Sequence, residues 1–283
     1  MALRSYLHTT FDPRRIPGLQ AWYDAADSAS VTLDSGRVSQ WSDKSGNARH
    51  ATNTTSGSTQ PSYSIAARNG LNVLTFAAAS VQRLTVPSST AAFNYLHNGT
   101  ESYVVAASVY GTSSNPNTFY SLFGNNAHAA ANIGFTQGYD DRVIGGSYSA
   151  NNGVYAIASS GSGSTLFRTV NVAANGLFAA YDSVINPQIM SIQESVVSAG
   201  NATASQRFRV RINGSSELTG NTFTGSPTSS NATFNFQLGA NGASATTLEG
   251  DICELMFFNQ LPTAAARDLI RRYLGSKWGV TVG

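Results

Sequence analysis

The chain contains a single cysteine, Cys253, among its 283 residues. One thiol forms no internal disulfide, so folding does not depend on an oxidising compartment. Because Cys253 lies in an apolar run, we interpret it as a small core residue. The sequence also has no run of about 18 apolar residues, the length that a membrane-spanning helix needs, and no signal-peptide-like apolar segment near its start. We therefore expect neither a membrane span nor export by that route.

Charged residues are scarce as well. Asp, Glu, Lys and Arg make up only 11% of the chain, and the formal net charge is +2. No basic run supplies the Lys and Arg density that a phosphate backbone requires, so nucleic acid is not an expected partner. The histidines are scattered without metal-ligand spacing, which argues against a zinc site. They are His8, His50, His97 and His128.

The hydrophobic content of 41% is sufficient for one large core. Short apolar runs alternate with turns rich in Ser, Asn and Gly, a pattern typical of an all-β sandwich. Trp22 and Trp41 flank such runs, and we predict that both rings are buried in the core. The candidate strands are 19–23, 31–33, 38–41, 71–76, 83–86, 103–110, 118–123, 131–135, 142–148, 154–158, 188–197, 207–212, 234–238 and 252–258.

One predicted hairpin has a clear signal. In 207–212 three arginines alternate with three apolar side chains, as expected of a strand with one buried face. Asn213 and Gly214 follow and supply a turn with positive φ. We interpret the arginine face as solvated exterior, with binding of a carboxylate or an acidic partner surface as the alternative.

The end of the chain carries the strongest pattern. Residues 252–258 are apolar at nearly every position, which predicts a central strand buried on both faces. Pro262 and Thr263 then open a predicted helix, which Thr263 caps, and Gly279 ends it in the left-handed conformation. The residues predicted to face the sheet are Leu269, Ile270, Tyr273, Leu274 and Trp278. The residues predicted on the remaining circumference are Arg267, Asp268, Arg271, Arg272 and Lys277.

Motifs near both ends point to one family. They read Pro-Gly-Leu-Gln-Ala-Trp-Tyr-Asp-Ala at 17–25, Trp-Ser-Asp-Lys-Ser-Gly-Asn at 41–47, Gly-Asp-Ile-Cys-Glu at 250–254 and Tyr-Leu-Gly-Ser-Lys-Trp-Gly at 273–279. This combination resembles the laminin G-like, concanavalin A-like lectin jelly-roll domains of bacteriophage and bacterial proteins. The resemblance implies an antiparallel β-sandwich, a concanavalin A-like jelly roll, with one C-terminal amphipathic helix. We expect that domain over 16–283.

The resemblance bears on cofactors too. Family members often have Phe-Asp-Gly at a turn where this chain has Phe76, Ala77 and Ala78, which weakens any inherited calcium site. Asp140 and Asp141 offer oxygen ligands for calcium, but adjacent acids in a turn are more often solvated. No cofactor is expected, with calcium at this pair as the alternative.

Glu249, Asp251 and Glu254 form an E-x-D-x-x-E pattern. In glycoside hydrolases with this kind of jelly roll, the same spacing provides a nucleophile, an assisting Asp and an acid/base for retaining hydrolysis. Here the pattern lies in the closing strand, Gly250 replaces a strand-forming residue, and two of the acids already belong to the non-catalytic motif. We therefore expect no enzyme, with the hydrolase as an alternative.

The N-terminal arm, 1–15, mixes cations and aromatic rings instead of linker residues. We interpret it as a segment docked on a neighbouring subunit or folded over its own domain. Its candidate partner-binding residues are Arg4, Tyr6, His8, Phe11, Arg14 and Arg15. For glycan contact, the candidates are the loop aromatics Tyr139, Tyr148 and Tyr155.

A lectin-like sandwich without an export signal is typical of a bacteriophage structural protein, because virions assemble in the host cytoplasm and leave by lysis. Our main hypothesis is therefore a non-enzymatic virion protein, either capsid decoration or a tail-associated appendage. Its expected partners are other virion proteins, copies of itself and cell-surface glycan. The alternatives are a carbohydrate-binding module of a bacterial surface protein and the hydrolase described above.

Overall fold

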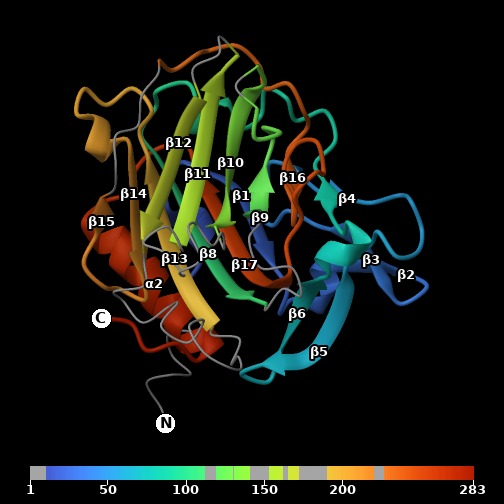
Figure 1. Ribbon diagram of the computed structural model, residues 1–283. Coiled ribbons are helices and arrows are strands. Elements are labelled where there is room, and N and C mark those ends of the chain that lie inside the picture. The colour runs from blue at the N-terminus through green and yellow to red at the C-terminus, as the bar shows by residue number, and fades with distance from the viewer. Residues whose placement is uncertain are drawn as a thin grey trace, which may run out of the picture.

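The computed structural model describes residues 11–111, 119–129, 131–140, 153–161, 165–171, 190–219 and 226–283. These residues form a mostly β structure with antiparallel strand pairs (Figure 1). In chain order the strands are β1 (Leu19–Asp24), β2 (Val31–Asp34), β3 (Arg37–Trp41), β4 (Ala51–Thr52), β5 (Ser62–Arg68), β6 (Leu71–Phe76), β7 (Leu84–Thr85), β8 (Ser102–Tyr110), β9 (Phe119–Gly124), β10 (Ile133–Asp140), β11 (Gly153–Ser160), β12 (Thr165–Asn171), β13 (Met190–Val197), β14 (Phe208–Ile212), β15 (Leu218–Thr219), β16 (Gln237–Leu238) and β17 (Gly250–Phe258). The helix α2 (Ala264–Trp278) follows β17.

The back layer is arranged around β17, all nine residues of which are buried. β8 pairs with one edge of β17, while β1 and β6 share the other edge. β13, β14 and β15 extend this layer beyond β8. The prediction of a central strand buried on both faces is confirmed.

The front layer continues from β12 through β11, β10, β9, β16, β7, β4 and β3 to β2. The β5–β6 hairpin joins the two layers, because β5 pairs with β3 and β6 pairs with β17. The chain therefore has the antiparallel β-sandwich that the sequence predicts.

One cluster of buried side chains lies between the layers. Phe123, Phe236 and Phe257 contact one another there, with ring centroids 5.0 to 5.8 Å apart. Trp41 belongs to the same cluster and is 0% exposed, and Trp22 is 7% exposed. Both tryptophans are therefore core residues, as predicted.

A second cluster lies between the back layer and α2, and includes Trp22, Met256 and Trp278. The helix begins and ends as expected. The Thr263 hydroxyl accepts a hydrogen bond from the Ala266 N–H at 3.2 Å, and Gly279 ends the helix with φ 73°. Because the apolar face of α2 covers one side of the back layer, β17 is shielded on both faces.

The predicted placement of three α2 residues is wrong. Leu269, expected on the buried face, is 50% exposed. Arg271, expected in solvent, is 6% exposed, because its guanidinium bonds the buried Glu194 carboxylate of β13, with Nε to Oε1 at 2.6 Å. Lys277, also expected in solvent, is 4% exposed, because it pairs with the buried carboxylates of Asp24 and Glu254. Helical spacing assigns long cationic side chains to the surface, but a buried carboxylate opposite reverses that assignment.

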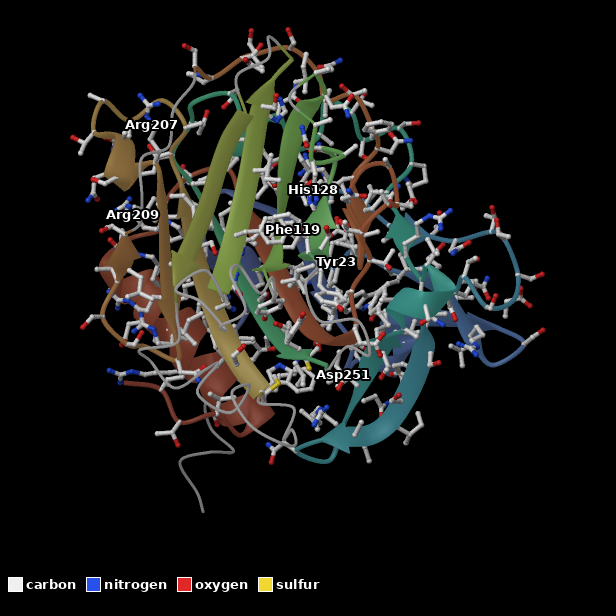
Figure 2. All side chains as sticks on the ribbon, viewed as in Figure 1. Tyr23, Phe119, His128, Arg207, Arg209 and Asp251 are labelled. Carbon is white, nitrogen blue, oxygen red and sulfur yellow. The ribbon has the colours of Figure 1, made fainter. Side chains whose placement is uncertain are left out.

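The alternation in β14 is confirmed, and Asn213 and Gly214 have φ 50° and 76°. The arginine face is less open than predicted, however. Arg209 lies beside Arg207 on this edge of the sandwich (Figure 2), and its side chain is 16% exposed. Its Nη2 pairs with a Glu101 carboxylate oxygen at 2.6 Å.

Several strand boundaries differ from the prediction. β4, β5 and β12 lie in segments for which no strand was predicted. The predicted strand at 234–238 shortens to β16, while 142–148 lies outside the described residues. No helix in the described ranges is long and apolar enough to span a membrane.

Candidate functional site

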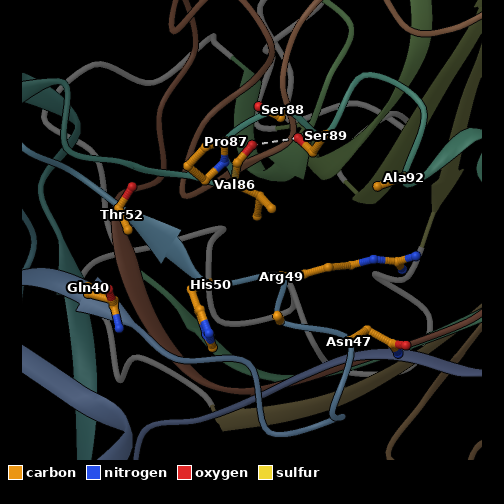
Figure 3. Close-up of a pocket in the computed structure, with 11 residues that line it drawn as sticks. Gln40, Asn47, Arg49, His50, Thr52, Val86, Pro87, Ser88, Ser89 and Ala92 are labelled. Atoms are coloured by element: carbon orange, nitrogen blue, oxygen red, sulfur yellow. Dashed lines mark hydrogen bonds between the residues drawn. The ribbon is translucent and has the colours of Figure 1, made fainter.

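A pocket of about 440 Å³ opens beside the β3–β4 hairpin (Figure 3). Two segments form its walls: one runs from the end of β3 into β4, and the other follows β7. The lining residues are Gln40, Asn47, Ala48, Arg49, His50, Thr52, Val86, Pro87, Ser88, Ser89 and Ala92. This volume falls within the usual range for a small-molecule site.

Asp43 determines the shape of the first wall. Its carboxylate accepts hydrogen bonds from the N–H groups of Trp22, Ser45 and Arg49 at 2.8 to 3.0 Å, and from the Ser45 hydroxyl at 2.8 Å. These bonds fold the 42–50 segment into a compact turn on β1. The turn presents Arg49 and His50 to the pocket.

His50 is one of those residues. The Asp43 N–H donates to its Nδ1 at 3.1 Å. A neutral imidazole whose Nδ1 accepts a hydrogen bond carries its proton on Nε2. His50 therefore lines the pocket as a ring with a fixed tautomer and a donor at Nε2.

Arg49 is the other. Its Nη1 and Nη2 donate to the backbone and side-chain oxygens of Gln20 at 3.1 and 2.9 Å. The guanidinium carbon lies 5.2 Å from the centroid of the Phe93 ring, within the range of a cation–π contact. These contacts hold the guanidinium in one orientation along the pocket wall.

The opposite wall is more apolar, with Val86, Pro87 and Ala92 facing the cavity (Figure 3). It is held by Ser89, whose hydroxyl donates to the Val86 carbonyl at 2.6 Å and accepts from the Phe236 N–H at 2.7 Å. An apolar wall facing fixed polar groups suits a ligand with both C–H and hydroxyl surfaces. None of the lining residues is Asp or Glu, so the pocket wall holds no pair of carboxylates for glycoside hydrolysis.

The carboxylates proposed for hydrolysis have other partners. Glu249 accepts from the Ala78 N–H at 2.8 Å, and Asp251, near the lower end of β17 in Figure 2, pairs with Arg68 at 2.7 Å. Glu254 is 0% exposed. None of these three carboxylates lines the pocket. The expectation that the chain is not an enzyme stays a prediction.

Glu254 belongs to a buried charge network. Lys277 Nζ lies 2.7 Å from Glu254 and 2.5 Å from Asp24, and the indole N–H groups of Trp22 and Trp278 also donate to Glu254. Burial raises the pKa of Glu254. Burial by itself lowers the pKa of Lys277, but the two carboxylates outweigh it and the net change is upward. The motif residues at both ends of the chain thus meet beneath α2 in a structural role.

Two of the three aromatics proposed for glycan contact are buried. Tyr139 and Tyr155 lie within β10 and β11 and are 1% and 0% exposed. Their hydroxyls bond Ser108 and Ser121, respectively. The prediction is wrong for these two rings. Tyr139 lies in β10, which extends beyond the predicted 131–135, and Tyr155 lies in the predicted strand 154–158 with its ring turned into the structure. Tyr148 lies outside the described residues.

Of the other candidate residues, some lie within the described residues and some do not. Asp140 ends β10, Asp141 lies outside the described residues, and the described part of the chain holds no cluster of metal-ligating side chains.

Of the candidate residues in the N-terminal arm, Arg4, Tyr6 and His8 lie outside the described residues. Phe11 contacts the Tyr273 ring of α2, with centroids 4.7 Å apart. It therefore packs on its own domain, one of the two alternatives for the arm.

Arg14 pairs with Asp12 at 2.9 Å and its side chain is 60% exposed, and Arg15 ends the short 3-10 helix Pro13–Arg15.

The pocket itself was not predicted from the sequence. The motif at 41–47 does not indicate that the 86–92 segment lies opposite Arg49 and His50.

No protein-family model matches the sequence, and a search of curated proteins finds no match. Solved structures match in fold. Domain 4 of a GH43 extracellular arabinanase from Geobacillus stearothermophilus, in complex with arabinotriose, matches with a TM-score of 0.54 and 16% identity, over 90% of this chain and 99% of that one. A Trypanosoma rangeli sialidase, in complex with the inhibitor DANA, matches with a TM-score of 0.52 and 11% identity, over 96% of this chain and 36% of that one.

This chain thus spans about a third of the sialidase, while it corresponds to the whole of the arabinanase domain. At these identities the likeness concerns the fold alone, which is that of a lectin-like β-sandwich. Neither of these two structures links the chain to bacteriophage proteins or to the laminin G-like family.

Proposed function

We propose that the chain is a carbohydrate-binding module that holds a glycan in the pocket between the β3–β4 hairpin and the 86–92 segment. The pocket is the observation that carries the proposal. It joins an apolar wall to oriented donors on Arg49 and His50, and such a combination suits the C–H faces and hydroxyl groups of a sugar. The arabinanase domain of similar fold was solved with arabinotriose, which supports the same class of ligand.

Filling the pocket tests the proposal. Ala92→Trp places a large ring on the apolar wall without removing any of the hydrogen bonds described above. We expect the affinity for a glycan found on an array to fall at least about tenfold, measured by calorimetry, because the ring excludes the sugar. Ala67→Trp, on an exposed position of β5, is the matched control. Equal affinity of the two variants and the wild type would reject the pocket as the site.

Binding without transformation is part of the proposal. Its support is that the walls of the pocket contain no carboxylate and that the three candidate acids are bonded elsewhere. Product analysis after incubation with the bound glycan tests it. The appearance of shorter oligosaccharides would contradict it.

A structural role in a bacteriophage virion stays a prediction from the sequence. The comparisons favour glycan binding over this alternative. The packing of Phe11 on Tyr273 does not require a neighbouring subunit. Incorporation of a variant without 1–15 into particles is the appropriate test, and wild-type incorporation would exclude the arm as the contact.

A further inference from the structure

We propose that the sugar bound in the pocket carries a carboxylate, and that Arg49 is the residue that pairs with it. The inference rests on the proposed function, because it specifies the class of glycan for the same pocket. It separates two kinds of ligand that the pocket volume alone does not distinguish: neutral sugars, and acidic sugars such as hexuronates.

The first support is the environment of Arg49. Its side chain is half-buried, and its two hydrogen bonds go to neutral oxygens of Gln20. A guanidinium has five N–H donors in a fixed plane, so the Gln20 bonds leave donors for a ligand. Across the described ranges, no carboxylate lies within ion-pair distance of Arg49. A cation partly withdrawn from water without a counter-ion favours an anion, and a carboxylate matches the guanidinium geometry best.

The charges around the pocket favour the same ligand. Arg49 is the one residue with a permanent charge among those that line it. Asp43 supports the wall but is not among the lining residues, and both of its oxygens accept hydrogen bonds within the turn. An incoming carboxylate therefore meets a guanidinium and no acidic side chain on the pocket wall.

The rest of the pocket suits the sugar ring. The Nε2–H of His50 is a donor of fixed position, and Ser88 adds a hydroxyl on the opposite wall. Val86 and Pro87 give the C–H face of a pyranose an apolar surface. The arrangement assigns the acid group of the sugar to Arg49 and its hydroxyl groups to His50 and Ser88.

The test compares pairs of sugars that differ in the acid group: galacturonate with galactose, glucuronate with glucose, and sialyllactose with lactose. Affinities are measured by NMR titration at low salt, with sodium sulfate as a competitor. For at least one pair, we expect the acidic member to bind about tenfold or more tightly than the neutral one. Sulfate at equal concentration should not displace it.

Arg49→Gln removes the charge and should abolish the preference for the acidic sugar, while Arg49→Lys retains part of it. Arg272→Gln is the matched control, because Arg272 is 63% exposed on α2 and should leave the preference unchanged. If the glutamine variant does not fold, the lysine variant and the sugar pairs still decide the question.

Each result has a separate meaning. Equal affinity for acidic and neutral sugars in every pair would overturn the inference and leave the proposed function intact. Displacement by sulfate as effective as by the acidic sugar would also overturn it, because the pocket would then bind anions and not acidic sugars. Failure of every sugar on a wide glycan array to bind would reject the proposed function itself.

Discussion

At the scale of single residues, the most consequential side chain is Lys277. It is 4% exposed and contacts two carboxylates, those of Asp24 and Glu254, which come from opposite ends of the chain. A buried ion pair adds little stability compared with well-packed apolar residues, but removing one partner leaves an uncompensated charge. The network therefore joins the two ends of the domain through the Lys277 ammonium group, and Lys44 also bonds Asp24 at 3.1 Å.

We predict that Lys277→Met lowers the free energy of unfolding by about 3 to 5 kcal/mol. The substitution keeps an unbranched side chain of nearly the same length and leaves the buried Glu254 without its cation, while Asp24 retains Lys44 at 3.1 Å. Urea denaturation measures the change. Arg272→Met, on the exposed side of the same helix, should change stability by no more than about 0.5 kcal/mol. A similar loss in both variants would refute a special role for the buried network.

The same lysine predicts a pH dependence. The pKa of Lys277 in the folded state lies above its ordinary value of 10.5. A group with a raised pKa contributes its full stability below the unfolded value and loses that contribution as the pH rises through the folded value. The stability difference between wild type and Lys277→Met should therefore be constant from pH 7 to 9 and shrink above pH 10.5. A difference that does not change up to pH 12 would contradict this assignment.

At the scale of elements, β17 contains an irregularity that the fold requires. The register between β17 and β8 shifts between Ile252 and Glu254. Because of this bulge, the side chains of the consecutive residues Cys253 and Glu254 both point to the side of the sheet that α2 covers. Just before the shift, Gly250 has φ 141°, and a Cβ added there would lie 2.2 Å from the Val109 carbonyl oxygen. Glycine at this position allows β17 and β8 to approach.

We predict that Gly250→Ala destabilises the protein by at least about 2 kcal/mol, because the added methyl group forces the central strands apart. Gly57→Ala is the control. Its φ of 102° is also unusual for alanine, but nothing lies within 4 Å of the added atom. Thermal unfolding of the two variants should separate the steric cost from the backbone cost. Equal melting temperatures would show that the contact with Val109 is unimportant.

The elements also show what the sequence can predict. β17, α2 and the alternation in β14 were predictable because their signals lie within a few consecutive residues. The burial of Arg271 and Lys277 was not, since it depends on Glu194, Asp24 and Glu254, which only the fold brings near. Tyr139 was misplaced because β10 continues past the predicted strand end, and Tyr155 because the side of the strand that is buried depends on the packing of the two layers. The pocket was missed for a related reason: its two walls come from segments that are separate in the sequence.

At the scale of the whole molecule, the motifs at the two ends of the chain have a structural role. They join β1, β17 and α2 around one buried network, which the turn of the first pocket wall also reaches, because Lys44 bonds Asp24 at 3.1 Å. The second pocket wall comes from a different segment, 86–92. A substitution on this second wall can therefore change binding without changing the closure of the domain.

This independence is testable with variants already described. Ala92→Trp should lose glycan binding while its free energy of unfolding stays within about 1 kcal/mol of the wild type, since it adds volume at an open wall. If the loss of binding always accompanies unfolding, the separation of the two regions is wrong.

The most direct test of the central claim, that this sandwich binds sugar in the pocket beside the β3–β4 hairpin, is a backbone NMR titration with a bound oligosaccharide. We predict that the largest shift changes fall on two segments, 40–52 and 86–92, and that Ala92→Trp removes them. Shift changes concentrated elsewhere on the sandwich would contradict the claim.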